Sequence, residues 1–373
     1  MSDKRDKIKY SRHLLLSEIG EIGQKKLAEA SVLVVGAGGL GCPVLQYLAA
    51  AGVGKIHIID GDRVEESNLQ RQVLYDEANI GKPKAEVAAT KLRKQNSLIA
   101  VHSYCSRLAR ENVSALFQVA DIIVDCSDNF GTRYLISDAA TLLGKPVVYG
   151  AVDRFQGQVT VFSLHPEAPT YRCLFPVASG LSGIQNCSET GVLGVVPGII
   201  GMIQATEVIK IICGFGEVLT GKVLFFDALN MQTMQIGLEK NPETIKNMPA
   251  DIEELMQWDY ELICDSKIST ISAAELYNAL QRKERFSFLD VREEAELPEV
   301  DLLSGHRIPL SVLESRFAEI DPSRRVVVYC KSGRRSAIAL QLLSEKYGFA
   351  KCIQLDGGID AWLQFEMLLT RKI

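Results

Sequence analysis

The sequence predicts an α/β protein with two domains: a doubly wound sheet of largely parallel strands, followed by a smaller α/β domain. Three observations support this prediction. Apolar strand patterns such as SVLVVG and KIHIID alternate with helical stretches such as GCPVLQYLAAAGV along the first two-thirds of the chain. A glycine-rich turn joins the first of these strands to the first of these helices. From about residue 269, the short strand patterns FSFLDVRE, RVVVYC and KCIQLDG again alternate with helical stretches.

A change in composition marks the boundary between the two domains. Strand patterns continue through DIIVDCSDN, GKPVVYGA, GQVTVFSL and GKVLFFDALNMQTMQIGL, so the first domain is expected to span residues 1–240. The next residues, NPETIKNMPADIEELMQWDYELICDSK, hold two prolines and many charges, and they predict a linker over 241–268. The second domain is then expected over 269–373.

Composition and charge exclude several classes of protein. A net charge of −5 over 373 residues gives no basic surface for nucleic acid. The most apolar stretch, GVLGVVPGIIGMIQATEVIKIICGF, contains Pro197, Gln204, Glu207 and Lys210, so it predicts a buried helix rather than a membrane span. The charged opening MSDKRDKIKYSRH is unlike a signal peptide. Nine scattered cysteines argue against a disulfide framework, and a cytoplasmic protein is expected.

The segment VVGAGGLG carries the first chemical signal. Gly36, Gly38 and Gly41 match the pattern G-x-G-x-x-G between a strand and a helix, which predicts a Rossmann-like nucleotide site. Asp60 ends the next strand, where an acidic residue meets a ribose hydroxyl in such sites. Taken alone, the motif suggests an NAD-dependent dehydrogenase. A tight turn without a ligand is the purely structural alternative.

Polar residues downstream of Asp60 favour a triphosphate instead. An arginine and a lysine beside the glycine turn suit a departing pyrophosphate, whereas the diphosphate of NAD needs only helix N–H groups. Asp128, at the end of DIIVDCSDN, is a candidate ligand for the Mg²⁺ that bridges such phosphates. Each basic residue alone could be a solvated surface charge, but the set together favours a site. It comprises Asn68, Arg71, Gln72, Lys82 and Lys84.

These segments closely resemble the MoeB/ThiF/HesA family, relatives of the ubiquitin-activating enzymes. The matching text includes YSRHLLL, GAGGLGCPVLQYLAAAGVG, DRVEESNLQRQ, GKPKAEVA, DCSDNFGTRY and NCSETGVLGVVPGIIGMIQATEVIK, and it covers residues from about 9 to 240. The resemblance implies that the domain binds MgATP and adenylates the carboxyl terminus of a ubiquitin-like sulfur-carrier protein ending in Gly-Gly.

The same resemblance implies roles for individual residues. Arg12 matches an arginine that reaches into the neighbouring subunit's ATP site, so a homodimer is expected. Arg71 and Asp128 take catalytic as well as binding roles. The implied nucleotide-binding residues are Arg12, Gly38, Gly39, Gly41, Asp60, Asn68, Arg71, Gln72, Lys84, Asp128 and Asn129.

The cysteines depart from the family pattern at one place and match it at another. The family commonly holds a structural zinc with two C-x-x-C pairs, but here Thr170 precedes Cys173 and the second pair is absent. Cys264 is the only nearby spare, so no zinc site is expected. Cys187, in IQNCSETG, lies in a polar segment and matches a family cysteine, which favours a reactive thiol over an inert one.

The segment VVVYCKSGRRSAIALQLL carries the second chemical signal. Cys330 ends a strand of β-branched residues and precedes a turn and a helix, where backbone N–H groups favour an anion. Arginines in the turn are expected to add positive charge, and Ser336 to cap the helix. Such a site suits a thiolate or a persulfide. The loop residues after the cysteine are Lys331, Ser332, Gly333, Arg334 and Arg335.

With FLDVREEAE, GHRIPL and LDGGIDAW, this segment resembles a single-domain rhodanese sulfurtransferase over roughly residues 270–370. Cys330 matches the cysteine that carries the persulfide, and its six-residue loop has the usual length. Asp290 and Arg292 match a structural DVR motif, for which packing and loop-support roles are expected. His306 is interpreted as a structural histidine.

The two resemblances imply one enzyme: adenylation activates the carrier's carboxylate, and the Cys330 persulfide displaces AMP to give a thiocarboxylate. The sulfur donor would be thiosulfate or the persulfide of a cysteine desulfurase. The receiving pathway, whether molybdopterin, thiamine or another thio-compound, stays open. The alternatives are an NAD-dependent dehydrogenase, a tRNA-modifying dehydratase of the same superfamily, and a scaffold that only binds ubiquitin-like proteins.

Overall fold

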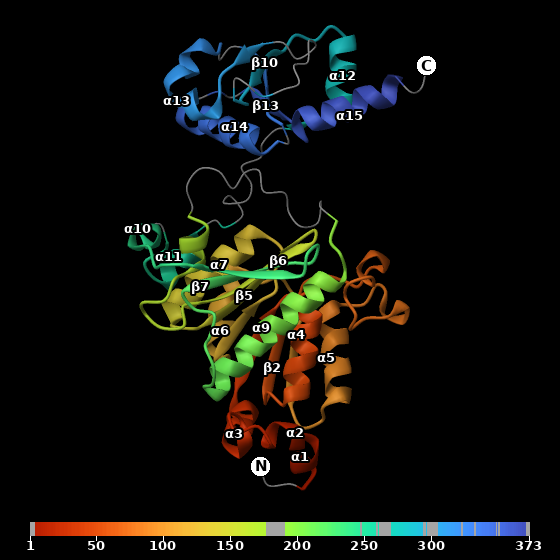
Figure 1. Cartoon of the computed structure of the whole chain (residues 1–373), viewed down its shortest axis with the longest axis vertical. Coiled ribbons are helices and arrows are strands. Elements are labelled where there is room, and N and C mark those ends of the chain that lie inside the picture. The colour runs from red at the N-terminus through yellow and green to blue at the C-terminus, as the bar shows by residue number, and fades with distance from the viewer. Residues whose placement is uncertain are drawn as a thin grey trace. The chain divides into compact units, whose positions relative to one another are not determined.

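The computed structural model describes residues 4–176, 191–246, 248–258, 260, 270–293, 296, 305–321, 324–331, 333–347, 349 and 351–370. The chain forms two compact units, and in the described residues the first ends at Tyr260 and the second begins at Thr270 (Figure 1). Each unit is an α/β structure with its own sheet, as the sequence predicted.

The first unit is built on an eight-stranded sheet in the order β3-β2-β1-β4-β5-β6-β7-β8. The first five strands are parallel and the last three run antiparallel. Because β1 lies between β2 and β4, the connections leave it in opposite directions, and in doubly wound sheets the ligand crevice lies at such a switch point, here the carboxyl ends of β1 and β4. The strands are β1 (Ser31–Val35), β2 (Lys55–Ile59), β3 (Ala100–Tyr104), β4 (Ile122–Asp125), β5 (Val147–Asp153), β6 (Gln156–Phe162), β7 (Lys222–Asp227) and β8 (Gln232–Gly237).

Helices cover this sheet, and the core forms between them. The side chains of Val32, Val34, Ile56 and Ile58 are fully buried with those of the crossover helix α4, which explains the continuous apolar strand patterns. The helices are α1 (Lys4–Lys9), α2 (Ser11–Leu14), α3 (Gly20–Glu29), α4 (Gly41–Ala51), α5 (Lys84–Gln95), α6 (Arg110–Gln118), α7 (Phe130–Leu143), α8 (Tyr171–Leu174), α9 (Val195–Cys213), α10 (Pro242–Ile245) and α11 (Ile252–Gln257).

Helix α9 is the one described helix long and apolar enough to cross a membrane by length and composition. It packs against β5, β6, α3 and α4. Its buried Gln204 donates hydrogen bonds to the carbonyls of Asp125 and Val148, and its buried Glu207 accepts from the N–H of Leu219. The apolar composition is therefore that of a core helix, as the interrupted sequence pattern indicated.

Residues 241–260 differ from the linker that the sequence suggested. Helices α10 and α11 lie on the first unit, where α11 contacts α6 and α7 and Leu255 is fully buried (Figure 1). The first compact unit therefore extends to Tyr260. Among the described residues of this segment, the charged side chains are exposed; they are Glu243, Lys246, Asp251, Glu253 and Glu254.

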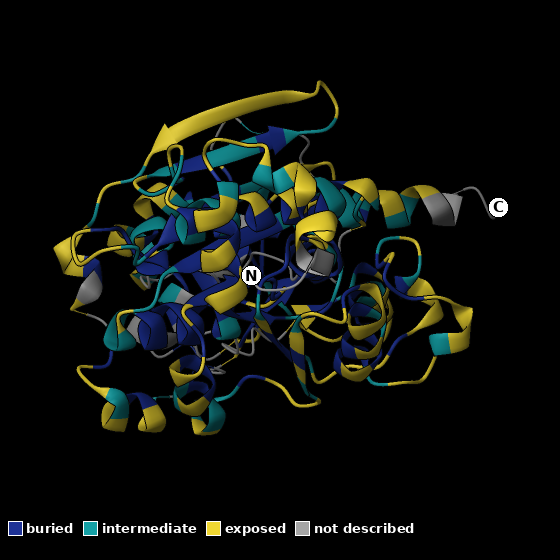
Figure 2. Ribbon diagram, turned by 90° about the horizontal axis from the view of Figure 1, so that it is seen from below, coloured by how far each residue is buried: buried dark blue, intermediate teal, exposed yellow. Residues whose placement is uncertain are grey.

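The second unit has a five-stranded parallel sheet in the order β11-β10-β12-β13-β9. Apolar clusters lie on both faces, and Trp362 is fully buried in one of them. In Figure 2 strands in the interior of the molecule are dark blue, whereas one long strand at the top is yellow, as expected for β8, in which every residue is exposed. The elements are β9 (Thr270–Ile271), α12 (Ala273–Gln281), β10 (Ser287–Asp290), β11 (His306–Arg307), α13 (Leu313–Arg316), β12 (Val326–Tyr329), α14 (Arg334–Tyr347), β13 (Cys352–Leu355) and α15 (Gly358–Thr370).

Candidate functional site

The glycine turn between β1 and α4 has a conformation that other residues would disturb. Gly36 has φ +94°, and a Cβ there would lie 2.7 Å from the carbonyl oxygen of Cys126. A Cβ at Gly41 would lie 2.0 Å from the carbonyl oxygen of Gly36. The N-cap residue of α4, Leu40, makes no side-chain capping hydrogen bond, and the N–H of Cys42 donates to the carbonyl of Gly38 at 2.9 Å, so the turn folds back on the start of the helix. This arrangement suits a phosphate.

Gly38 faces a buried polar group. The nearest atom to a Cβ built at Gly38 is Nε2 of Gln72, at 3.7 Å. Gln72 is buried, and its Oε1 has no hydrogen-bond partner among the described residues. An unsatisfied buried acceptor is costly, so a donor group of a bound ligand is its natural partner. Asn68, one turn earlier, is also buried.

Asp60 directly follows β2 and connects the glycine turn to that strand. Its carboxylate accepts hydrogen bonds from the N–H of Ala37 at 2.7 Å and the N–H of Asp62 at 2.8 Å. Burial raises the pKa of Asp60 above its usual value, against the effect of these hydrogen bonds. Asp60 therefore lies beside the turn, as predicted, and its two backbone bonds also give it a supporting role there.

Two of the predicted basic residues, Arg71 and Lys84, lie near the same turn. The guanidinium of Arg71 donates to the carbonyl of Ser67 at 3.0 Å, and its Cγ lies 3.6 Å from a Cβ built at Gly39. Lys84 begins α5, and its buried ammonium pairs with the carboxylate of Asp62 at 3.2 Å. Both charges therefore border the crevice, Arg71 partly exposed and Lys84 held in place.

Asp128 and Asn129 follow β4 at the same edge of the sheet. The side chain of Asn129 caps α7, because its Oδ1 accepts the N–H of Thr132 at 2.9 Å. Asp128 is exposed and forms no ion pair with the described residues. A free carboxylate at the carboxyl end of β4, across from the glycine turn, fits a hard cation such as Mg²⁺.

Two predicted residues are not part of this cluster. Arg12 is exposed on α2, which lies with α1 and α3 at the far end of the first unit from the carboxyl edge of the sheet (Figure 1). Cys187 lies outside the described residues.

Cys173 receives hydrogen bonds at the position where zinc ligands were considered. Its sulfur lies 3.4 Å from the N–H nitrogens of Thr170 and Asn241, and 3.5 and 3.7 Å from the hydroxyls of Thr170 and Thr244. Burial alone would raise the pKa of this thiol, but the N–H and hydroxyl donors lower it below its usual value. One sulfur among hydroxyl and N–H donors does not fit zinc, and the described chain holds no cluster of three metal-binding side chains.

Cys330 follows β12 and is almost fully buried. The hydroxyl of Ser336 lies 3.6 Å from its sulfur and 2.9 Å from the carbonyl oxygen of Gly333, so the single proton of this hydroxyl is shared between the two acceptors. The carbonyl of Cys330 accepts the N–H of Ile359 at 2.8 Å. The cysteine is therefore fixed by its own loop and by the start of α15.

Glycines allow this loop to close against α15. Gly333 has φ +91°, and its carbonyl accepts a 2.7 Å hydrogen bond from Nε2 of Gln354. Gly358 has φ +62°, and a Cβ there would lie 2.4 Å from the carbonyl oxygen of Cys330. The motif LDGGIDAW supports the loop in this way, a role that the sequence comparison did not specify.

The positive charge of Arg335 is paired with a carboxylate, which the sequence did not predict. Its guanidinium forms a bidentate ion pair with Glu296, in which one N–O distance is 2.8 Å. This hydrogen bond lowers the pKa of Glu296 to about 2. Arg335 therefore adds less net positive charge to the loop than predicted. The carboxylate of Asp290 likewise pairs with Arg292 and Arg307.

The structure places two of the other loop residues. Lys331 is exposed, Arg334 begins α14, and Ser332 lies outside the described residues. The sequence analysis missed Glu296, although it stands in the quoted segment FLDVREEAE.

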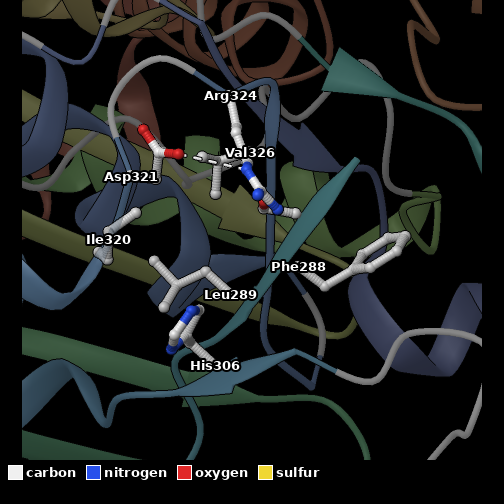
Figure 3. A pocket seen from close by; sticks show the side chains of 8 residues that line it. Phe288, Leu289, His306, Ile320, Asp321, Arg324 and Val326 are labelled. Atoms are coloured by element: carbon white, nitrogen blue, oxygen red, sulfur yellow. Dashed lines mark ion pairs between the residues drawn. The ribbon is translucent and has the colours of Figure 1, made fainter. Parts of the chain in front are cut away.

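A small pocket in the second unit lies away from Cys330. Its volume is about 210 Å³, and it opens at the amino ends of β10 and β12, whereas Cys330 follows the carboxyl end of β12. Figure 3 shows the ion pair between Asp321 and Arg324 beside it and His306 below. The pocket belongs to the opposite edge of the sheet from the sulfur.

Two family models match the chain. The ThiF family model matches residues 10–246, and the rhodanese-like domain model matches residues 272–365. The first range contains the glycine turn and its polar neighbours, and the second contains the Cys330 loop. The predicted resemblance to both families is therefore confirmed.

Curated relatives combine both activities in their names. The probable adenylyltransferase/sulfurtransferase MoeZ of Mycobacterium tuberculosis is 43% identical over 370 residues, 95% of this chain and 92% of that protein. The adenylyltransferase and sulfurtransferase MOCS3-1 of Zea mays is 41% identical over 95% of this chain and 81% of its own length. The sulfur carrier protein adenylyltransferase of Thermus thermophilus is 46% identical over 70% of this chain and 97% of its own length.

Solved structures match the first unit. Escherichia coli MccB with ATP has a TM-score of 0.56 and 25% identity, covering 65% of this chain and 73% of that one. The microcin C7 biosynthetic enzyme MccB in complex with N-formylated MccA has the same TM-score, 27% identity and coverages of 65% and 75%. Adenylyl transfer and sulfur transfer are thus the two activities of this enzyme, and the chain belongs to the ThiF family, with a rhodanese-like domain joined to it in the same polypeptide.

Proposed function

We propose that this enzyme adenylates the C-terminal glycine of a ubiquitin-like sulfur-carrier protein ending in Gly-Gly and converts it to a thiocarboxylate. The proposal is supported by the presence of a nucleotide-type crevice and a persulfide-type loop in one chain, and by the printed names of its relatives. The single observation that carries it is Gln72, whose side-chain Nε2 lies beside the glycine turn and whose buried Oε1 has no partner among the described residues, because an unsatisfied buried acceptor favours a bound ligand over an empty structural turn.

In the first step, a carboxylate oxygen of the carrier attacks the α-phosphorus of ATP. The new bond forms the acyl adenylate, and the bond to the β-phosphate oxygen breaks to release pyrophosphate. Arg71 and Lys84 border the crevice and would neutralise the departing charge. Asp128 would hold Mg²⁺, which supplies further charge neutralisation on the phosphates. Asn68, Gln72 and Asp60 would orient the nucleoside.

In the second step, the terminal sulfur of a Cys330 persulfide attacks the acyl carbon, and AMP leaves with the electrons of the C–O bond. The product is an acyl disulfide with Cys330. A thiol, from Cys187 or from an external donor, then attacks the Cys330 sulfur, forms a disulfide with it and releases the thiocarboxylate. An external dithiol reduces that disulfide.

Persulfide loading precedes this sequence. The Cys330 thiolate takes the outer sulfur of thiosulfate and releases sulfite, or it takes a persulfide sulfur from a cysteine desulfurase. The Ser336 hydroxyl and the loop backbone would hold the anionic sulfur. The residues Lys331, Ser332, Gly333, Arg334 and Arg335 would enclose it.

The working assembly is proposed to be a homodimer in the cytoplasm. Arg12 lies away from the crevice of its own chain, which supports a role in a second copy's ATP site. The seven cysteines within the described residues are all free thiols, which suits a reducing compartment. The product would supply sulfur to molybdopterin, thiamine or another thio-compound.

The direct test uses purified enzyme, ATP, thiosulfate, a dithiol and a small carrier protein ending in Gly-Gly. We expect mass spectrometry of the carrier to show one oxygen replaced by sulfur, with release of AMP and pyrophosphate. A carrier without its terminal glycine is the matched control. Exchange of labelled pyrophosphate into ATP separates this function from a dehydrogenase, and a gel shift with tRNA separates it from a tRNA dehydratase.

A further inference from the structure

Residues 241–260, between the last strand of the first unit and the second unit, are attached to the first unit at three places. The first attachment is at Cys173 of α8. The N–H of Asn241 and the hydroxyl of Thr244 approach its sulfur at 3.4 and 3.7 Å. Thr244 is buried, and Lys240 donates to the carbonyl of Pro166 at 2.6 Å. The start of the segment is therefore fixed without a metal.

The second attachment is helix α11. Asp251 caps it by accepting the N–H of Glu254 at 2.8 Å. Leu255 is fully buried where α11 contacts α6 and α7. The guanidinium of Arg110, at the start of α6, donates to the carbonyl of Trp258 at 3.2 Å. Burying one leucine side chain contributes on the order of 2 kcal/mol, enough to hold a short helix that would not form alone.

The third attachment is at Tyr260, the last described residue of the first unit. Its hydroxyl donates to the carboxylate of Asp138 at 2.8 Å. That carboxylate is also held by a bidentate pair with Arg172, both N–O distances being 2.7 Å, and both residues are buried. Burial raises the pKa of Tyr260, so its hydroxyl stays a neutral donor. Arg172 and Cys173 are neighbours on α8, so one short helix holds both ends of the segment.

We propose that residues 241–260 are a fixed spacer rather than a tether, and that Tyr260 and Leu255 are positioning residues that shorten the path of the Cys330 persulfide to the adenylated carrier. This inference rests on the proposed function for its chemistry, but the spacer itself rests only on the contacts above.

The consequence is a shorter connecting chain between the first unit and Thr270. Thr270, at the start of β9, follows Tyr260 by ten residues, so the chain between them spans at most about 33–36 Å. If the segment were free from Lys240 onward, thirty residues would intervene and the extended chain would reach roughly 100 Å. For a flexible connection longer than its span, effective concentration falls roughly as the −3/2 power of length, so a threefold longer connection lowers it about fivefold.

The first experiment lengthens the connection without touching the spacer. About twenty glycine and serine residues are inserted between Tyr260 and Glu261 of the full-length enzyme. The enzyme is loaded with thiosulfate, freed of excess donor and mixed with ATP and carrier in a single turnover. We expect thiocarboxylate formation to slow about fivefold. Pyrophosphate exchange, and sulfur transfer from thiosulfate to cyanide, should both be unchanged. An unchanged rate of thiocarboxylate formation would overturn the proposal.

The second experiment releases the spacer. In the double variant Leu255→Ala/Tyr260→Phe, we expect peptides covering 242–260 to exchange amide hydrogens at least tenfold faster than in the parent enzyme. The single-turnover rate should fall as in the insertion variant, and free sulfide should restore it. The matched control is Leu98→Ala/Tyr47→Phe, at exposed positions of the same unit.

The outcomes separate the two proposals. Rapid exchange of 242–260 in the parent enzyme would refute the spacer whatever the chemistry. A parent enzyme that forms no thiocarboxylate even with free sulfide would refute the proposed function, and the exchange measurement would then decide the spacer by itself.

Discussion

The two units assemble their reactive groups in different ways. In the first, the groups come from residues 36 to 129 and meet because parallel strands end at one edge of the sheet. In the second, the sulfur of Cys330 and the hydroxyl of Ser336 lie within seven consecutive residues. Gly358, from a distant segment, allows the backbone there to pack against the Cys330 loop. In a site spread along a sheet edge, removing one charged side chain should lower the rate by the contribution of that side chain only. A site made of one loop should depend on a single atom and on backbone conformation.

The largest effect is expected for Cys330→Ser. Serine fits the loop but cannot carry a sulfane sulfur, so thiocarboxylate formation from thiosulfate should be abolished. Adenylation should be intact, and free sulfide should bypass the block because the acyl adenylate accepts any sulfur nucleophile. Mass spectrometry of the carrier gives the result. Full thiocarboxylate from thiosulfate in this variant would mean that sulfur enters elsewhere, with Cys187 as the first candidate.

The next effect is expected for Arg71→Ala and Asp128→Ala. Removing one group that stabilises developing charge typically costs about 10²–10³-fold in rate, and pyrophosphate exchange should fall by that factor. Sulfur transfer from thiosulfate to cyanide should be unchanged, because it needs only the second unit. Lys25→Ala, at an exposed position on α3, is the control. Loss of both activities in a folded variant would show that the two sites are not independent.

A third variant, Gly358→Ala, tests the importance of backbone conformation. A Cβ at φ +62° and 2.4 Å from the Cys330 carbonyl oxygen forces the loop apart. Strain of this kind costs about 1–3 kcal/mol, and the contact adds to it. We expect calorimetry to show lower stability of the second unit alone, together with slower sulfur transfer. Gly237→Ala, where a Cβ meets no atom within 4 Å, should leave both units unchanged.

A smaller effect is expected from pH at the pair of Glu296 and Arg335. The pKa of Glu296 is lowered to about 2 in the folded protein, against about 4.3 when unfolded. The pair's contribution is therefore complete above about pH 4.3 and is lost as pH falls toward about 2. Because the carboxylate is partly exposed, the contribution is at most about 1 kcal/mol. Urea unfolding of the second unit at about pH 6 and pH 3 should show a smaller difference in Glu296→Gln than in the parent. An equal difference would exclude the pair as a source of pH dependence.

No effect is expected from chelation. Cys173 is held by hydrogen-bond donors rather than by a second thiolate, so a strong chelator should leave the melting temperature unchanged. Elemental analysis of the purified enzyme should find no stoichiometric zinc. Roughly one zinc per chain, lost together with stability on chelation, would contradict this reading of the cysteines.

The sequence by itself determined both kinds of fold and predicted where both candidate sites lie. Its strand and helix patterns are local, and one contiguous motif marks each site: Gly36 to Gly41 at one, Cys330 to Ser336 at the other. Glycine at a strand-to-helix turn permits a positive φ and a close backbone approach that other residues disfavour, and such local requirements can be recognised without a structure.

Only the tertiary structure decided how the more distant residues pair. Glu296 neutralises Arg335 from 39 positions away, and Tyr260 meets Asp138 across 122 positions. Charged residues at such distances look solvated in a sequence, because their patterns do not show which partner the fold supplies. The same reason hid the packing of residues 241–260, whose single fully buried leucine stands among charges. Burial and pairing are properties of the folded chain. Here they lower the net positive charge of the Cys330 loop, and they attach residues 241–260 to the first unit.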